Sequence, residues 1–138
     1  MKKKINKIGI LGGTFDPCHL GHLKISIHAK KNLKLSKIIW AITKKNPYKS
    51  VSNLSLEKTI KESKKFTKKY KFIQIKYFEK IIRSNRTFNL VSYLKDKLAT
   101  TDLYLIIGAD NLINLHKWSK WKNIPKKCNI LVYNRHTY

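Results

Sequence analysis

The sequence predicts an α/β domain built on a parallel β-sheet that is covered by helices on both faces. Five short apolar runs alternate with segments of helical periodicity along the 138 residues. The second and fourth runs are continuously apolar, which is typical of parallel strands buried on both faces. A glycine pair follows the first run just before a helical pattern, where α/β domains bind phosphate. We therefore expect a doubly wound sheet with right-handed crossovers.

Residues 8–23 are the segment around which the rest of the chain is organised, and they read as a strand, a tight loop and a helix start. Gly12 and Gly13 permit positive φ and let a ligand approach the backbone closely. His19 and His22 lie on the first turn of the helix, whose unpaired N–H groups and partial positive charge attract anions. We expect both imidazoles to donate to a phosphate. The spacing matches neither the P-loop nor the G-x-G-x-x-G pattern.

The other elements follow in chain order. A helix at 20–33 has apolar residues that we expect to face the sheet, namely Leu20, Leu23 and Ile27. A surface helix spans 54–70, and Thr87 is the expected N-cap of a helix with an apolar stripe at Phe88, Val91, Leu94 and Leu98. The later strands are expected at 38–43, 72–77, 103–107 and 130–133. The connection 78–86 is read as a basic loop.

Two segments follow strands at the edge of the sheet where open α/β domains bind ligands. The polar loop 44–49 is either a solvated connection or a substrate and phosphate loop. Asp110 follows Gly108, and it can contact a ribose or a hydrated metal, or act as the N-cap of a helix at 111–116. Trp118 is either a core residue or a ring that stacks on a base.

The composition limits the class of partner. The formal net charge is +24, yet 28 of the 31 basic residues are lysine, which fits codon drift toward A and T at least as well as a polyanion-binding surface. We therefore expect no nucleic-acid partner. No Cys or carboxylate cluster completes a metal site with the two histidines. Two isolated cysteines suit a reducing cytosol, and no apolar run approaches the ~20 residues of a membrane span, so we expect a cytoplasmic protein.

The first motif resembles a known signature. Gly12-Gly13-Thr14-Phe15-Asp16-Pro17 with His19-Leu20-Gly21-His22 is similar to the G-G-T-F-D-P-x-H-x-G-H string of the HxGH nucleotidyltransferases. Later landmarks resemble the nicotinate-nucleotide adenylyltransferases of that superfamily, in the same order along the chain. They are a P-H-K-like loop at 46–49 with Tyr48 for the histidine, Asn85-Arg86-Thr87 at the S-Y-T position, an I-G-x-D-x-L segment at 107–112 with Trp118, and an altered R-P-G-Y at 135–138.

The resemblance implies a Rossmann-like nucleotidyltransferase fold with strand order 3-2-1-4-5. It also implies adenylyl transfer from ATP, bound with Mg²⁺, to nicotinate mononucleotide, giving deamido-NAD and pyrophosphate in NAD biosynthesis. We expect residues 1–138 to form a single domain that lacks the family's C-terminal I-S-S-T-x-I-R phosphate-binding segment. Three alternatives stay open: a catalytically impaired nucleotide-binding remnant, a sister HxGH transferase with another acceptor, and a polyanion-binding module that uses the positive charge. A homodimer is also left open.

The resemblance further assigns roles to individual residues, and it implies no protein metal site. The catalytic residues would be His19 and His22, which hold the phosphates. The ATP and phosphate ligands would be Gly12, Gly13, Thr14, Phe15, Gly21, Lys49, Gly108 and Asp110. The pyridine nucleotide would contact Thr87, Trp118 and Arg135. Backbone N–H groups would hold the carboxylate of the pyridine ring.

Overall fold

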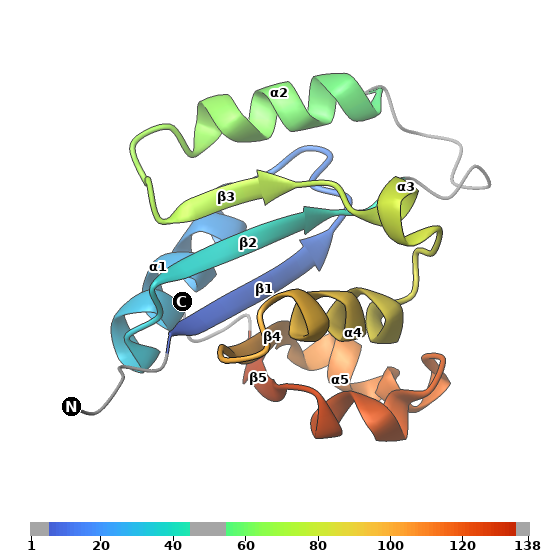
Figure 1. Ribbon diagram of the computed structural model, residues 1–138. Helices are drawn as coiled ribbons and strands as arrows, with labels where there is room; N and C mark the ends of the chain where they lie inside the picture. Colours follow the sequence, from blue (N-terminus) through green and yellow to red (C-terminus); the bar gives the residue numbers. More distant parts are fainter. Residues whose placement is uncertain (1–5, 45–54, 135–138) are drawn as a thin grey trace.

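The computed structural model describes residues 6–44 and 55–134, and it contains one parallel sheet in the order β3-β2-β1-β4-β5 (Figure 1). This confirms the predicted fold class and strand order. The strands are β1 (Lys7–Gly13), β2 (Lys37–Ile42), β3 (Ile73–Lys76), β4 (Asp102–Gly108) and β5 (Asn129–Tyr133). Because β1 is central and the chain leaves it in one direction and returns to its other side at β4, the carboxyl end of β1 is the switch point of the sheet.

Helices cover both faces of the sheet (Figure 1). They are α1 (Leu20–Leu33), α2 (Leu56–Phe66), α3 (Glu79–Ile82), α4 (Thr87–Lys97) and α5 (Ala109–Ile113), with 3₁₀ segments η1 (Leu115–Lys117) and η2 (Trp121–Lys126). Side chains of α1 and α2 pack in one core cluster, and those of α4 and η2 pack in the other. Successive strand residues alternate between the two clusters, so β2 is buried from Ile38 to Ile42.

The face that α1 turns to the sheet differs from the expected one. Leu20 and Ile27 are 56% and 38% exposed, so the prediction that they face the sheet is wrong, whereas Leu23 is buried as predicted. Ser26 lies on the buried face instead, because its hydroxyl accepts from the fully buried Trp40 Nε1 at 2.8 Å. The same hydroxyl donates to the carbonyl oxygen of His22 at 2.8 Å. A hydrogen-bond requirement of the indole therefore overrides the simple apolar stripe.

The glycine pair does not use the positive φ that glycine permits. Gly12 and Gly13 continue β1 and pair with Ala41 and Ile42 of β2, and no described glycine has a positive φ. The left-handed residue of this loop is Phe15, with φ 50°. Strand pairing holds the two glycines extended, and the chain turns two residues later.

Three element boundaries differ as well. Thr87 is the first helical residue of α4, and Arg86 stands at the N-cap without a side-chain cap, so Thr87 is not the predicted N-cap. The helix α3 lies inside the connection that was read as a loop. Asp110 lies in the first turn of α5, whose N-cap is Gly108. In the part of the chain that the structure describes, no helix has the length and apolar character needed to cross a membrane.

Candidate active site

The two histidines are held by a stack of aromatic rings at the carboxyl end of β1. Trp40 of β2 stacks on Phe15 with 4.8 Å between ring centroids, and Phe15 lies 4.6 Å from His22. His22 in turn stacks on His19 at 3.8 Å. Phe15 is only 2% exposed, and its buried ring packs against His22. The backbone at Phe15 is left-handed, which is uncommon for a residue with a side chain.

Hydrogen bonds within the first turn of α1 fix which imidazole nitrogen each histidine presents. The Nδ1 atom of His19 accepts from Gly21 N at 3.1 Å, and the Nδ1 atom of His22 accepts from His19 N at 3.1 Å. A neutral imidazole that accepts at Nδ1 carries its proton on Nε2. Both rings therefore present an Nε2–H donor, and the backbone of the helix start is capped by the same two side chains.

His22 is uncharged at neutral pH. Burial, together with a smaller contribution from the neighbouring His19, lowers its pKa from 6.5 to about 4. A neutral ring keeps Nδ1 available as an acceptor, so the low pKa and the hydrogen bond from His19 N support each other. What His22 offers a ligand is a fixed Nε2–H dipole.

The histidines line a pocket above α1, which we call the phosphate pocket. Its described wall residues are Leu11, Gly12, His19, Gly21, His22, Ile25, Gly108, Asp110 and Asn111. The pocket thus brings together most of the residues predicted to bind ATP and phosphate, from β1, α1 and the β4–α5 junction. Its imidazole donors and the N-terminal end of α1 suit an anion. Among residues 6–44 and 55–134 no cluster of three or more His, Cys, Asp or Glu could hold a metal ion.

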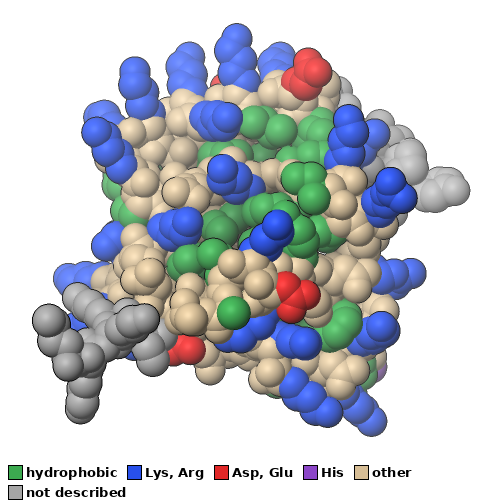
Figure 2. Space-filling model, in the orientation of Figure 1, with side chains coloured by type: hydrophobic (Ala, Val, Ile, Leu, Met, Phe, Trp, Pro, Cys, Tyr) green, Lys and Arg blue, Asp and Glu red, His purple; other side chains and the backbone are tan. Residues whose placement is uncertain are grey.

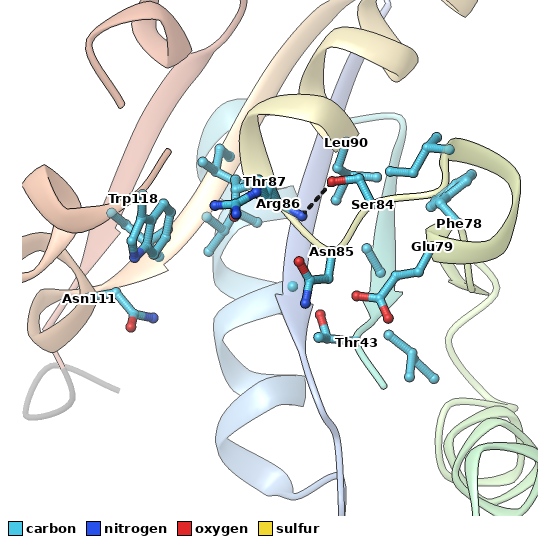
Figure 3. A pocket seen from close by; sticks show the side chains of 17 residues that line it. Thr43, Phe78, Glu79, Ser84, Asn85, Arg86, Thr87, Leu90, Asn111 and Trp118 are labelled. Carbon is cyan, nitrogen blue, oxygen red and sulfur yellow. Dashed lines mark hydrogen bonds between the residues drawn. The ribbon is translucent and has the colours of Figure 1, made fainter. Parts of the chain in front are cut away.

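A second pocket, which we call the acceptor pocket, opens on the α4 side of the sheet. Its described walls include Gly12, Thr43, Glu79, Ser84, Asn85, Arg86, Thr87, Asn111 and Trp118, above a floor from β2 and β4. Figure 3 shows Trp118 and Asn111 on one side, Thr43 and Glu79 on the other, and Arg86 and Thr87 between them. A flat aromatic wall next to polar groups suits a ring with polar substituents.

The two pockets meet at the switch point of the sheet. Gly12 and Asn111 line both of them. If Gly12 carried a Cβ, the nearest heavy atom among the residues that the structure describes would be the Ala41 carbonyl oxygen, 3.9 Å away. Open space therefore lies next to this residue. A ligand in one pocket can therefore reach a ligand in the other across Gly12. This arrangement can bring two nucleotides together phosphate to phosphate.

The structure does not bring every predicted residue into these walls. Gly13, Thr14 and Phe15 follow β1 next to the pockets but are not among the described wall residues. Thr14 is exposed, and the ring of Phe15 is buried. Lys49 and Arg135 lie outside the described residues.

Glu79 and Asn111 are among the polar wall residues that sequence reasoning missed. Glu79 belongs to α3, which was not expected, and its Oε1 accepts from Lys44 N at 2.9 Å. Asn111 stands next to Asp110, and only the three-dimensional position of α5 makes it the residue common to both pockets. A polar residue directly after a predicted site residue is the signal that could have indicated it.

The sequence was compared with protein families and known proteins. The Cytidylyltransferase-like family matches residues 10–138. A protein of Pelagibacter ubique named "Probable nicotinate-nucleotide adenylyltransferase" is 55% identical over the whole chain, which spans 76% of that relative. A protein of the same name from Clostridium perfringens is 36% identical over 95% of this chain and 66% of its own length.

Solved structures share the fold. The Plasmodium falciparum nicotinic acid mononucleotide adenylyltransferase complexed with NaAD matches with a TM-score of 0.73 and 16% identity, over 94% of this chain and 75% of that one. The same enzyme complexed with APC matches with a TM-score of 0.75, over 94% of this chain and 74% of that one. At this identity the likeness supports the sheet order and the layers of the fold.

Proposed function

The chain belongs to the nicotinate-nucleotide adenylyltransferase family, and we propose that it transfers the adenylyl group of ATP to nicotinate mononucleotide, giving deamido-NAD and pyrophosphate. The observation that carries this proposal is the meeting of the phosphate pocket and the acceptor pocket at Gly12 and Asn111. The reaction needs two nucleotides whose phosphates touch. It is a step of NAD biosynthesis.

The chemistry is a displacement at phosphorus without a covalent enzyme intermediate. A phosphate oxygen of nicotinate mononucleotide attacks the α-phosphorus of ATP, and the bond from that phosphorus to the bridging oxygen of the β-phosphate breaks. The electron pair and the negative charge leave with pyrophosphate. The step makes and breaks only phosphorus–oxygen bonds. Catalysis therefore consists of aligning the two nucleotides and of stabilising negative charge on the triphosphate.

His19 and His22 serve the departing phosphates in this proposal. Their Nε2–H groups point the positive end of a fixed dipole at the charge that grows on the leaving group. A neutral His22 needs no change of protonation state during turnover. Gly12 carries no side chain, which leaves room for the attacking oxygen to reach the α-phosphorus.

The remaining wall residues are each assigned to one of the two nucleotides. Asp110 and Gly108 line the phosphate pocket, where they would contact the ribose of ATP or water on Mg²⁺. Mg²⁺ enters with the triphosphate as part of the substrate and offsets its charge. Trp118 offers its indole face to the pyridine ring, and Thr87 closes the pocket beside it. The two unpaired cysteines, Cys18 and Cys128, are consistent with a cytoplasmic location for this reaction.

The direct test is pyrophosphate release by the purified chain with ATP, Mg²⁺ and nicotinate mononucleotide, run for the wild type, His22→Asn and His116→Asn. The asparagine oxygen can replace Nδ1 as acceptor from His19 N but offers no Nε2–H, so helix capping is kept while the donor is lost. We expect a rate loss of roughly 100-fold or more. His116 is exposed in η1, outside the described walls, and its variant should keep the wild-type rate.

Three other outcomes contradict the proposal in different ways. Binding of the pyridine nucleotide without release by the wild type indicates a nucleotide-binding remnant of the family. Release with a different acceptor, but not with nicotinate mononucleotide, indicates a sister transferase. Equal rates in the wild type and His22→Asn would remove the role assigned to His22.

A further inference from the structure

The acceptor pocket has a single cationic side chain among its described wall residues, that of Arg86. Glu79, the acidic wall residue, accepts from Lys44 N at 2.9 Å on the other side of the pocket. Figure 3 shows Arg86 between Glu79 and Trp118, at the start of α4. The two charges therefore divide the pocket, and the positive one lies toward the aromatic wall.

Arg86 is not one of the two residues that the pockets share. The acceptor phosphate must lie where the two pockets meet, at Gly12 and Asn111, because it attacks ATP there. Arg86 is a wall residue of the acceptor pocket but not a described wall residue of the phosphate pocket. With Thr87 and Trp118 it lines the acceptor pocket, in which the pyridine ring would stack on Trp118.

The local backbone leaves the donors of Arg86 available. Its main-chain N–H donates to Ser84 Oγ at 3.0 Å, and the same hydroxyl accepts from Asn89 Nδ2 at 2.8 Å, which fixes the turn before α4. No described side chain caps the N-terminus of α4. The guanidinium of Arg86 has no ion-pair partner among the residues that the structure describes. The charged guanidinium of Arg86 is thus part of the pocket wall, next to the uncapped N-terminus of α4.

We propose that the Arg86 guanidinium binds the carboxylate of the pyridine ring and selects nicotinate mononucleotide over its amide counterpart. The inference rests on the proposed function. A guanidinium presents paired N–H donors in a plane, which match the two oxygens of a carboxylate and pair with its charge. The amide has one oxygen and an NH₂ group whose hydrogens would face the N–H donors of arginine. Arginine at this position replaces the tyrosine of the S-Y-T pattern, so this chain adds a side-chain donor to the backbone donors expected there.

The test compares the acid and the amide mononucleotide on the wild type, Arg86→Gln, Arg86→Lys and Arg83→Gln. Binding is measured by calorimetry, and kcat/KM is measured by pyrophosphate release. We expect the acid to bind Arg86→Gln about 10- to 100-fold more weakly than the wild type, with a change of less than about threefold for the amide. Arg86→Lys keeps the charge but loses the planar guanidinium. Its affinity for the acid should lie between those of the wild type and Arg86→Gln.

Arg83→Gln is the matched control. Arg83 is exposed at the C-terminal end of α3, three positions before Arg86, and is not a described wall residue of the acceptor pocket. Its loss removes the same charge from the same region, so an unchanged acid-to-amide ratio is expected. A ratio that falls equally in Arg83→Gln would show a general field effect and overturn the proposal.

The remaining outcomes separate this inference from the proposed function. If the affinities for the acid and the amide fall equally in Arg86→Gln, so that the acid-to-amide ratio stays at its wild-type value, Arg86 does not recognise the carboxylate. The transferase assignment is then judged separately, from the turnover of the wild type. If the wild type releases no pyrophosphate with either compound, the transferase assignment fails. The ratio of binding constants then still decides the role of Arg86.

Discussion

His22 illustrates how one side chain performs two tasks at the residue scale. Its Nδ1 atom accepts from the backbone of His19 and thereby closes the first turn of α1. Its Nε2–H is left to face the phosphate pocket. The first task requires a neutral ring, because a protonated imidazole has no acceptor atom. Burial against Phe15 and Trp40 supplies that condition, so the aromatic stack and the chemistry of the site are coupled.

The low pKa of His22 predicts how folding stability depends on pH. The pKa is about 4 in the folded chain and 6.5 without the protein environment, so the unfolded chain binds more protons between these values. Stability contributed by the neutral ring is therefore present above pH 6.5 and is lost as the pH falls toward 4. The loss is on the order of 2 kcal/mol, discounted because part of the ring meets solvent.

Urea unfolding at pH 7 and pH 4.5 measures this effect in the wild type and in His22→Asn. The variant has no titrating ring at this position, so its free energy of unfolding should fall less over the same interval. His28→Asn changes an exposed histidine of the same helix, and it serves as a comparison. Parallel losses in the wild type and His22→Asn would mean that another group carries the acid sensitivity.

At the scale of elements, β1 contains glycines with separate purposes. A Cβ on Gly9 would lie 3.0 Å from Leu35 Cδ1, 3.1 Å from Ile106 Cδ1 and 3.2 Å from Ile38 Cγ1, so this glycine makes room for side chains of the two neighbouring strands and of the α1–β2 connection. A Cβ on Gly12 would meet nothing described closer than the Ala41 carbonyl oxygen at 3.9 Å. Gly9 therefore serves the fold, and Gly12 serves the space between the two pockets.

The pair Gly9→Ala and Gly12→Ala tests this division. Gly9→Ala should lower the free energy of unfolding by about 1–3 kcal/mol through overpacking, with kcat little changed at a temperature where the chain stays folded. Gly12→Ala should keep nearly wild-type stability but lose turnover, because its methyl group enters the space where the acceptor phosphate approaches ATP. Thermal unfolding measures the stability of each variant, and pyrophosphate release measures its turnover. A Gly12→Ala chain with wild-type turnover would contradict the proposed meeting point.

The elements also show what the sequence could reveal and what it could not. The buried strands and the order of the motifs were predictable, because parallel strands are continuously apolar and the G-G-T-F-D-P and H-x-G-H strings are specific. The burial of Ser26 was not predictable, since it depends on Trp40, a partner from a different element. The same holds for Asn111, whose place in both pockets follows from packing. Local patterns give element types, whereas long-range side-chain contacts decide which face and which residue meet the ligand.

On the scale of the whole molecule, the dominant feature is the excess of positive charge, +24 at pH 7. Figure 2 shows Lys and Arg side chains around much of the visible surface, including a row along α2. Lys58, Lys61, Lys64 and Lys65 are exposed on this helix. Such a charge attracts anionic nucleotides from a distance, and it also repels itself in the compact state.

Self-repulsion predicts that added salt stabilises the fold. Raising sodium chloride from about 10 mM to about 300 mM shortens the Debye length from about 30 Å to about 6 Å and screens the lysines from one another. We expect the melting temperature to rise by a few degrees, since about 1 kcal/mol shifts it by roughly 2–8 °C in domains of this size class. A chain held mainly by surface ion pairs would respond in the opposite direction, because the same screening weakens attractions.

Anion binding in the phosphate pocket would also raise the melting temperature, so the experiment must separate it from screening. Chloride and inorganic phosphate are compared at equal ionic strength, on the wild type and on His22→Asn. Screening acts alike in both chains, whereas any additional gain with phosphate should shrink when the Nε2–H donor of His22 is absent. A melting temperature that falls with chloride would show that attraction between charges outweighs repulsion, and the lysine excess would then have to be explained by pairing with the acidic residues of the chain.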